Sequence, residues 1–196
     1  MGIILSCYCR KLWTLGRKKF SVLGFSDGGT TGLILAAQYP EHIRKLVVWG
    51  ANTYVNEKDI EIQRGMEDIG HWTASARSRY SQLYEDGYLR AHCSKWVKAS
   101  RNCLAHSKFM FTDSQSDICK AELENITCPT FILHGMKDPL TTTEHPVYLS
   151  KHIKNSRLHI IPEGNHHIHM FRADEFNKMV EEFLLECGWT DLIKFT

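Results

Sequence analysis

FSVLGFSDGG, residues 20–29, is the stretch of this sequence that decides the fold. Its first part, Phe20 to Gly24, is a short apolar run that stops at a glycine, which is typical of a buried parallel strand. From Asp27 the residues become small and then apolar until Pro40, which a helix does not easily continue through. The stretch therefore predicts a strand, a tight turn and a helix in direct succession.

Strand patterns recur along the rest of the chain. Lys45 to Gly50 is the next apolar run, so strand, helix and strand follow one another within about thirty residues, the size of a βαβ unit. Two more runs, Thr130 to His134 and Arg157 to Ile161, have the same character. Helices are predicted from Glu144 to Ile153 and from Ala173 to Glu186. This alternation predicts an α/β fold with a parallel sheet flanked by helices.

Residues 52–124 differ from the flanking segments, because they carry many charges and show no convincing strand pattern. Apolar residues at near-helical spacing predict helices at Ile60 to Ile69 and at Tyr80 to Trp96. Such a layer is expected to cover one end of the sheet. We interpret residues 1–196 as a single domain in which residues 53–124 form a helical lid insertion.

Length, composition and charge exclude several classes of protein. A chain of 196 residues, 43% of them hydrophobic, is long enough for one sizeable core. The net charge of +2 is spread along the chain and offers no basic patch to nucleic acid. The seven cysteines include no C-x-x-C pair, which favours free thiols in a reducing compartment. No apolar run reaches the roughly 18 to 20 residues that cross a bilayer, so we expect no membrane span.

Gly24-Phe25-Ser26-Asp27-Gly28 matches the pattern G-x-S-x-G at the point where a strand turns into a helix. Such a turn is strained and exposes the serine hydroxyl, and we expect glycines at both flanks to let strand and helix approach without Cβ clashes. The helix N-terminus and the amide of Asp27 are expected to face the oxygen that becomes negative when a carbonyl is attacked. The alternative is a plain turn in which Ser26 caps the helix.

A serine nucleophile needs a base and an acid that orients the base, and the sequence offers both. Asp138 follows the strand that ends at His134, and His166 follows the strand that ends at Ile161. Each lies just beyond the carboxyl end of a predicted parallel strand, where active sites of open α/β sheets collect. Ser26, Asp138 and His166 stand in the chain order of the α/β-hydrolase fold, so we predict that they form a catalytic triad.

Other histidines compete with His166 for the role of base. His134 and His159 lie within predicted strands and are expected to be packed or surface residues. His167 is expected to point away from the partner of His166. A metal site formed by His166, His167 and His169 is the alternative, but no carboxylate motif accompanies these residues. We therefore expect neither a metal nor an organic cofactor.

The motifs around these residues resemble those of a known family. They are Gly24-Phe25-Ser26-Asp27-Gly28-Gly29, Val48-Trp49-Gly50-Ala51-Asn52, His134-Gly135-x-Lys137-Asp138-Pro139-Leu140, Pro162-Glu163-Gly164-Asn165-His166 and Ala173-Asp174-Glu175-Phe176-Asn177-Lys178. In these motifs the chain resembles the biphenyl hydrolase-like (valacyclovir hydrolase) family of α/β-hydrolases. The resemblance runs from roughly Lys18 to Phe183 and so covers most of the chain.

The resemblance implies a hydrolase of α-amino acid esters, with Ser26 as nucleophile, His166 as base and Asp138 as the acid that orients it. It also implies that Asp27 binds the α-ammonium group of the substrate. A carboxylate beside the nucleophile pairs with a cation next to the scissile carbonyl. The alternative is an acidic residue favoured by the helix dipole alone. We expect a small-molecule ester as substrate, a monomer, and no nucleic-acid partner.

The chain departs from this family before the nucleophile. Few residues precede Ser26, and they contain neither the early strands of the fold nor the glycine-rich loop that supplies a second oxyanion donor. We therefore expect a partial α/β-hydrolase domain lacking the N-terminal strands, and losing one such donor costs roughly a hundred to a thousandfold in rate. Two alternatives follow: a catalytically inactive hydrolase-fold protein that binds a partner, and a hydrolase of carbon–carbon bonds, to which Asp27 offers no advantage.

The N-terminal residues bear on location in the cell. The first twenty residues include five basic residues and no acidic one, a weak feature of mitochondrial transit peptides. Met1 to Ser6 also fits the N-myristoylation pattern at Gly2, with Cys7 and Cys9 available for a second lipid. Because the family resemblance points to mitochondria, we expect a mitochondrial or cytoplasmic protein.

Overall fold

The computed structural model describes residues 14, 16, 18–111 and 116–186. The lipidation pattern that begins at Met1, and most of the basic N-terminal stretch, lie outside the described residues. The chain forms two compact units. One combines the residues up to 53 with those from 119 onward and is called here the sheet unit; the other, residues 54–118, is called the helical unit.

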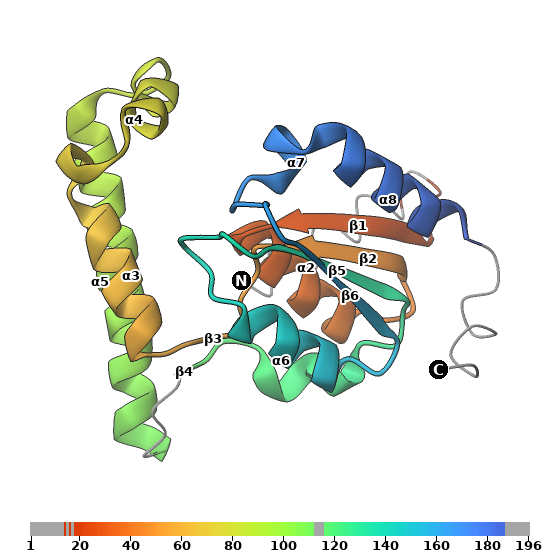
Figure 1. The fold of residues 1–196 in the computed structure, drawn as a ribbon. Helices are drawn as coiled ribbons and strands as arrows, with labels where there is room; N and C mark the ends of the chain where they lie inside the picture. Colours follow the sequence, from red (N-terminus) through yellow and green to blue (C-terminus); the bar gives the residue numbers. More distant parts are fainter. Residues whose placement is uncertain (1–13, 15, 17, 112–115, 187–196) are drawn as a thin grey trace. The chain divides into compact units, whose positions relative to one another are not determined.

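The sheet unit contains a parallel sheet of four strands (Figure 1). The strands are β1 (Phe20–Phe25), β2 (Ile43–Trp49), β5 (Thr130–Gly135) and β6 (Ser156–Ile161), in the spatial order β1-β2-β5-β6. Each strand lies where the sequence predicts one, with small shifts at the ends. The predicted parallel sheet is therefore confirmed.

The strand register brings the carboxyl ends of the strands to one edge of the sheet. Phe25 at the end of β1 pairs with Trp49 at the end of β2. Trp49 in turn pairs with Leu133 of β5, and Gly135 pairs with Ile161 at the end of β6. Because all four strands run in the same direction, the loops that follow them leave from this edge, where sites of open α/β sheets form.

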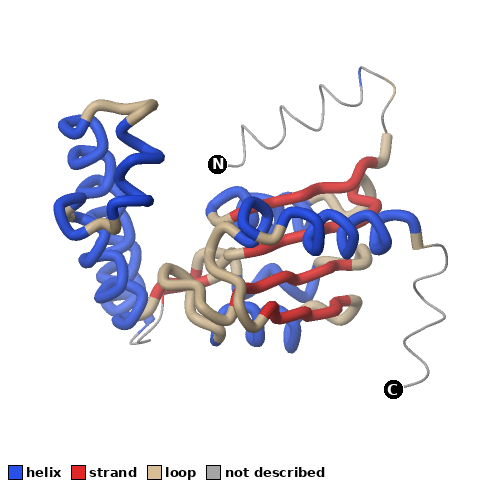
Figure 2. The backbone as a smooth tube through the Cα atoms, turned by 45° about the horizontal axis from the view of Figure 1, so that its top comes forward, coloured by secondary structure: helices blue, strands red, loops and turns tan. Residues whose placement is uncertain are grey.

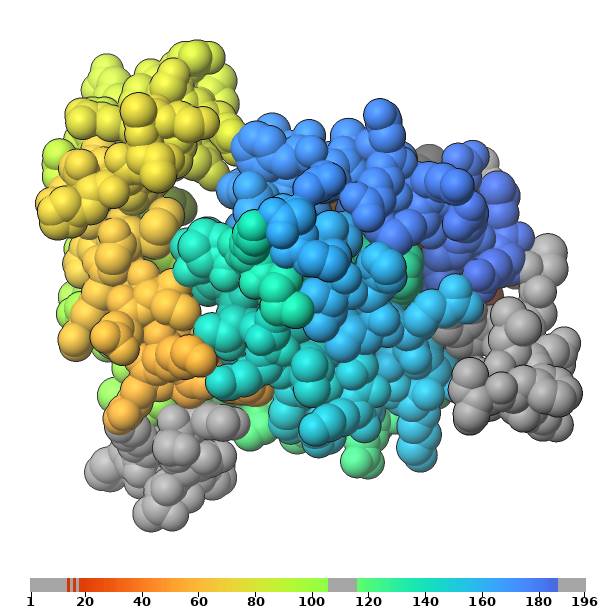
Figure 3. Space-filling model, in the orientation of Figure 1, coloured from red at the N-terminus to blue at the C-terminus, as the bar shows by residue number. Residues whose placement is uncertain are grey.

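Helices cover both faces of the sheet (Figures 1 and 2). On one face lie α2 (Asp27–Gln38), the short 3-10 helix η2 (Lys120–Asn125) and α6 (Glu144–His152). On the other face lie α7 (Ile168–Phe171) and α8 (Ala173–Leu185). Figure 3 shows α7 and α8, in blue, as a continuous surface beside β6 and the loop that follows it, in lighter blue. The prediction of a sheet flanked by helices is confirmed.

Alternation along β2 builds a hydrophobic core on each face, because successive side chains of a strand point to opposite sides. Leu46 and Val48 are both 0% exposed and belong to the core beneath α2 and α6. Val47 is also 0% exposed and belongs with Trp49 to the core beneath α7 and α8. Each such side chain contributes about 1.5–3 kcal/mol of burial, so both helical layers are tied to the same central strand.

Lys45 is a buried cation in β2, 7% exposed, that joins the sheet to the end of α8. Its ammonium group donates to the backbone carbonyls of Phe183, Leu184 and Glu186, at 2.5, 3.2 and 2.8 Å. The last carbonyls of a helix have no partner within the helix and attract positive charge. Lys45 therefore satisfies the C-terminus of α8 from the neighbouring sheet.

The helical unit consists of helices and one short pair of strands (Figure 1). Its elements are β3 (Tyr54–Val55), α3 (Glu57–Glu67), the 3-10 helix η1 (Ile69–His71), α4 (Ala74–Ser81), α5 (Asp86–Phe111) and β4 (Ser116–Asp117). β3 and β4 pair antiparallel, and two-residue strands are too short to show an alternating pattern in the sequence. That this unit acts as a lid stays a prediction.

One predicted helix of this unit, Tyr80 to Trp96, is wrong in its boundaries. The structure divides it: α4 ends at Ser81 and α5 begins at Asp86. The apolar residues at the break do not face a core, since Leu83 is 74% and Tyr84 46% exposed, whereas Leu89, beyond it in α5, is buried. Without burial to stabilise one long helix, the chain turns, and Asp86 begins the next helix where the helix dipole favours an acidic residue.

Candidate active site

The turn between β1 and α2 holds Ser26 in a strained conformation. Ser26 has φ 53° and ψ −124°, and no other non-glycine residue in the described part of the chain has a positive φ. A Cβ atom on Gly24 would lie 2.6 Å from the carbonyl oxygen of Gly28, so strand and helix meet at van der Waals contact there. Strain of this kind is concentrated at functional sites.

The second glycine that this turn requires is Gly29, and the prediction for Gly28 is wrong. A Cβ atom on Gly29 would lie 2.7 Å from the Cβ atom of Ala51, whereas one on Gly28 would meet nothing within 4 Å. Gly28 lies on the exposed side of the first helical turn, while Gly29 faces the segment after β2. The G-x-S-x-G pattern does not distinguish the two because the sequence has glycine at both positions.

Two loops at the carboxyl edge of the sheet place Asp138 and His166. They approach so closely that a Cβ atom on Gly135 would stand 2.4 Å from the carbonyl carbon of Gly164. The amide of Lys137 donates to the carbonyl of Gly164 at 2.8 Å, and the side chain of Lys137 pairs with Glu163. These contacts fix the loop after β5 against the loop after β6.

The structure brings the three predicted residues together. Nδ1 of His166 lies 2.7 Å from Oδ2 of Asp138, and Nε2 lies 3.2 Å from Oγ of Ser26. Both distances are within hydrogen-bond reach. The imidazole therefore bridges a buried carboxylate and a serine hydroxyl that is 140 residues away along the chain.

Asp138 is held as a carboxylate despite its burial, with a side chain 1% exposed. Burial raises the pKa of this carboxyl. The hydrogen bond and charge of His166 and the amides of Leu140 and Thr141 together lower it by more, so the pKa lies below its ordinary value. Both amides donate to Oδ1, at 2.8 and 3.0 Å, which leaves Oδ2 for His166. An ionised, oriented acceptor of this kind fixes the tautomer of a neighbouring imidazole.

The ring of His166 is enclosed by residues that the sequence motifs contain but that were not predicted to act. Gly50 has φ 60°, and a Cβ atom there would lie 2.8 Å from Cε1 of His166. The ring of Phe25 lies 4.8 Å from the ring of His166, centroid to centroid. The signal that could have identified them is position: Gly50 directly follows β2, and Phe25 directly precedes Ser26.

The other candidates are placed as follows. Asp27 begins α2 with an exposed side chain. His159 is exposed on β6 and His134 is buried, 1% exposed, in β5, so both lie within strands as predicted. His167 packs against Phe25, with 5.4 Å between ring centroids.

Among the side chains that the structure describes in residues 18–105 and 116–186, no three from histidine, cysteine or acidic residues gather as a metal site requires. His166 contacts Asp138 and Ser26, and Nδ1 of His169 accepts a hydrogen bond from the indole N–H of Trp49 at 3.0 Å. The alternative site at His166, His167 and His169 is therefore not formed in the structure.

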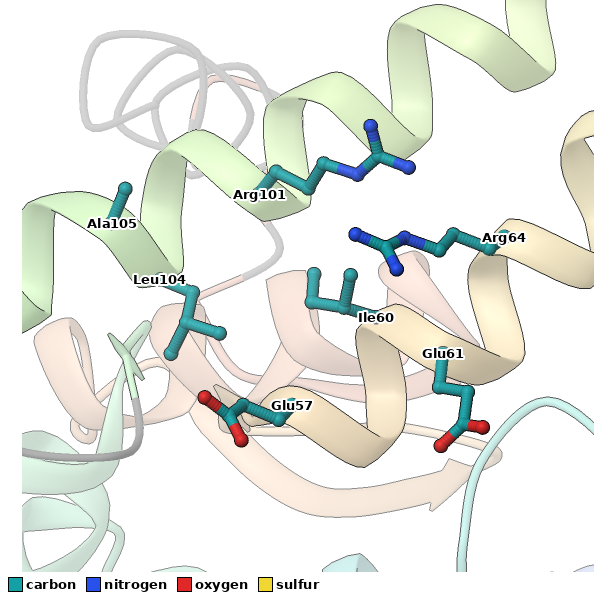
Figure 4. A pocket seen from close by; sticks show the side chains of 7 residues that line it. All are labelled: Glu57, Ile60, Glu61, Arg64, Arg101, Leu104 and Ala105. Atoms are coloured by element: carbon teal, nitrogen blue, oxygen red, sulfur yellow. The ribbon is translucent and has the colours of Figure 1, made fainter.

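A separate hollow of about 460 Å³ lies within the helical unit, between α3 and α5 (Figure 4). It is lined by Glu57, Ile60, Glu61, Arg64, Arg101, Leu104 and Ala105. The side chains of Arg64 and Arg101 reach toward one another from the two helices. None of the predicted site residues lines this hollow.

Comparisons with known proteins relate the chain to known hydrolases. The family of hydrolases described as serine aminopeptidase, S33 matches residues 14–171. Two proteins named serine hydrolase BPHL, from Mus musculus and Homo sapiens, are 46% and 44% identical over 167 residues, 85% of this chain. The resemblance to the biphenyl hydrolase-like family is thereby confirmed, although the chain spans only 55% of the length of either relative.

A likeness among solved structures concerns the fold alone. MGS-M2, an alpha/beta hydrolase enzyme from a Medee basin deep-sea metagenome library, aligns with a TM-score of 0.68 at 19% identity. The alignment covers 94% of this chain and 71% of that one. The predicted α/β-hydrolase fold is therefore confirmed. No helix among the described residues has the length and apolar character that crossing a membrane requires.

Proposed function

The chain belongs to the serine aminopeptidase, S33 family of hydrolases, and on this premise we propose that it is a serine hydrolase that cleaves α-amino acid esters or similar small esters through an acyl-enzyme. One observation carries the proposal: His166 lies between Asp138, at 2.7 Å, and Ser26, at 3.2 Å. A strained serine, a base in reach of it and a buried acid behind the base are the groups that acyl transfer needs.

In the first step Oγ of Ser26 attacks the ester carbonyl carbon and its proton passes to Nε2 of His166. The carbonyl π electrons move to the oxygen, and Asp138 stabilises the imidazolium through the Nδ1–H bond. When the tetrahedral intermediate collapses, the carbon–oxygen bond breaks and the leaving alcohol takes the proton from Nε2. Water then attacks the acyl-serine in the same way, which releases the acid and restores Ser26.

The N-terminus of α2 is suited to the negative oxygen that forms in both steps. Gly29 provides the first amide that bonds within the helix, to the carbonyl of Ser26 at 2.8 Å. The amide of Asp27 precedes it in the chain. As one of the first amides of the helix, it points along the helix axis and has no acceptor within the helix. We assign this amide as one oxyanion donor, with the positive end of the helix dipole behind it.

The position of Asp27 is the basis for proposing α-amino acid esters as the substrate class. Its exposed carboxylate stands directly after the nucleophile, where it can pair with a cation two bonds away from the attacked carbonyl carbon. A charge-assisted hydrogen bond of this kind contributes roughly 1.5–3 kcal/mol, a preference of about ten to a hundredfold. An α-ammonium group fits this position, and a neutral or anionic substrate gains nothing from it.

The proposal concerns a chain that covers 55% of the length of its curated relatives. Their printed name, serine hydrolase, supports the reaction class and names no ester. The substrate, the acyl-enzyme, a monomeric state and a mitochondrial or cytoplasmic location are therefore proposals for this chain.

The test compares L-phenylalanine methyl ester with methyl 3-phenylpropanoate, which differs only by the missing amino group. We expect the parent chain to cleave the amino ester at least tenfold faster in kcat/KM and Ser26→Ala to cleave neither. Asp27→Asn should raise KM for the amino ester only. Asp174→Asn, in the exposed first turn of α8, is the matched control and should change neither substrate.

A folded parent chain without Ser26-dependent turnover would overturn the proposal and favour the alternative of an inactive protein with a binding role. Equal rates on the two esters would leave a serine hydrolase but overturn Asp27 as the ammonium partner. The alternative of a carbon–carbon bond hydrolase is tested in the same assay, by comparing the esters with a ring-fission product as substrate.

A further inference from the structure

Three residues that neighbour Ser26 and His166 pack against one another. Phe25 precedes Ser26 at the end of β1, Trp49 ends β2, and His169 lies in α7, three residues after His166. Each comes from an element that also positions an active-site group. Together they form a cluster of Phe25, Trp49 and His169, which we call the aromatic support.

A directed hydrogen bond joins two members of the aromatic support. The indole Nε1 of Trp49 lies 3.0 Å from Nδ1 of His169. An indole N–H can only donate, so Nδ1 of His169 must accept and carries no proton. A neutral His169 then has its proton on Nε2, and the ring orientation in α7 is fixed by Trp49.

His169 is suited to remain an acceptor near neutral pH. Burial and the nearby His166 both disfavour its charged form, burial more strongly, so its pKa lies below the ordinary value. A charged His169 would carry protons on both nitrogens and would lose the bond from Trp49. The environment of the ring therefore preserves the bond that orients it.

Ring contacts connect the Trp49–His169 pair to the imidazole of His166. The ring of Phe25 lies 4.6 Å from that of His169 and 4.8 Å from that of His166, and it stacks on Trp49 at 5.7 Å. The His166 ring also meets Gly50, where a Cβ atom would stand 2.8 Å from Cε1. The imidazole thus has packing partners that restrict its rotation toward and away from Ser26.

We infer that Trp49 and His169 are positioning residues, whose hydrogen bond holds the aromatic support in the arrangement that keeps His166 in reach of both Ser26 and Asp138. This rests on the proposed function insofar as His166 acts as the base. The competing interpretation is an ordinary buried core, in which the size of the side chains matters and the hydrogen bond does not. The two differ in what an isosteric acceptor at position 169 should restore.

The experiment uses three variants of the full chain. Trp49→Phe removes the donor, His169→Leu removes the acceptor, and His169→Asn keeps an acceptor, because the amide oxygen of asparagine occupies nearly the place of Nδ1. Trp72→Phe is the matched control, since its indole also donates a hydrogen bond, at 3.1 Å to the carbonyl of Met66 in the helical unit. Thermal unfolding of each variant verifies that it is folded.

We expect Trp49→Phe and His169→Leu to lower kcat on the amino ester about tenfold with KM unchanged within twofold, because the ester-binding groups are not altered. His169→Asn should retain kcat within about threefold. If Asn behaves like Leu, or if Trp72→Phe costs as much as Trp49→Phe, the hydrogen bond has no positioning role and the inference is wrong.

Histidine NMR decides the inference even if the parent chain hydrolyses no ester. With ¹⁵N-labelled histidine we expect His169 as the Nε2–H tautomer, and a downfield proton on Nδ1 of His166 that persists in His169→Asn and broadens or vanishes in His169→Leu. An Nδ1–H tautomer of His169, or an unchanged downfield proton in His169→Leu, overturns the inference. Absence of Ser26-dependent hydrolysis overturns only the proposed function.

Discussion

Gly50 lies directly against the ring of His166: a Cβ atom at residue 50 would stand 2.8 Å from Cε1 and 3.1 Å from Nδ1 of the imidazole. Gly50 also has φ 60°, and its carbonyl accepts a hydrogen bond from the hydroxyl of Thr141 at 3.2 Å. Thr141 donates its backbone amide to Asp138. The residue after β2 is thus in contact with His166 and is linked to Asp138 through one residue, Thr141, by its hydroxyl and its amide.

Gly50→Ala should therefore impair both stability and the site. A side chain in the left-handed region costs about 1–3 kcal/mol, and the new methyl group would push the imidazole away from Ser26. We expect the unfolding free energy to fall by about that amount and hydrolysis to fall at least tenfold. Gly65→Ala is the control, because a Cβ atom there meets nothing and a helical alanine should add about 0.5–1 kcal/mol. Equal stability of the two variants would contradict the account.

Two inactive variants at Ser26 should differ in stability. Ser26→Gly should be more stable than Ser26→Ala by about 1 kcal/mol in urea unfolding, because glycine removes the strain of a Cβ atom at φ 53°. That gain exceeds the additional chain entropy that glycine loses on folding. A more stable alanine variant would show that the turn is not strained.

Lys45→Met should destabilise the sheet unit by about 2–3 kcal/mol, because the carbonyls of Phe183, Leu184 and Glu186 would lose a charged donor. Arg44→Met is the control: it changes a neighbouring residue of the same strand whose side chain is exposed. Urea unfolding followed by tryptophan fluorescence measures both. Matching midpoints in the two variants would mean that the cap of α8 contributes no stability.

Acid should destabilise the fold in two stages. Burial lowers the pKa of His134 from its ordinary 6.5. Below about pH 6.5 the unfolded chain therefore binds more protons than the folded chain, and the free energy of unfolding falls as the pH is lowered. The slope is at most about 1.4 kcal/mol per pH unit for each such histidine. Asp138, whose pKa lies below its ordinary 3.8, adds a second loss below about pH 4.

His134→Leu should reduce the slope of the first stage of this pH dependence and leave the part contributed by His169, whose pKa is also lowered by burial. His134 is 1% exposed and its Nε2 has no hydrogen-bond partner among the described residues, so leucine removes a group that the interior tolerates only when neutral. Urea unfolding at pH 7 and pH 5 measures the slope. His159→Leu, which changes an exposed residue of β6, should keep the parent slope. A parent-like slope in His134→Leu would rule out His134 as its source.

Much of this site could be predicted from the sequence because its groups follow short, strongly patterned strands. Ser26, Asp138 and His166 each come just after an apolar run, and parallel strands bring their ends to one edge. The prediction needed only strand positions and chain order. It did not need side-chain packing.

What could not be predicted depends on contacts between distant segments. The role of Gly29 rather than Gly28 is set by Ala51, and the role of Gly50 is set by a ring 116 positions later in the chain. The break before Asp86 depends on the exposure of Leu83, which periodicity alone does not report. Such features follow from tertiary packing and leave no local signal.

The most direct test of the triad is intact-mass analysis of the full chain after treatment with a fluorophosphonate, which phosphonylates activated serines and requires no knowledge of the substrate. We predict a single adduct, mapped to Ser26, that is absent in Ser26→Ala and forms at least a hundredfold more slowly in His166→Gln. A folded parent chain that stays unlabelled, or one labelled at the same rate in His166→Gln, would contradict the assignment of Ser26, His166 and Asp138 as a working triad.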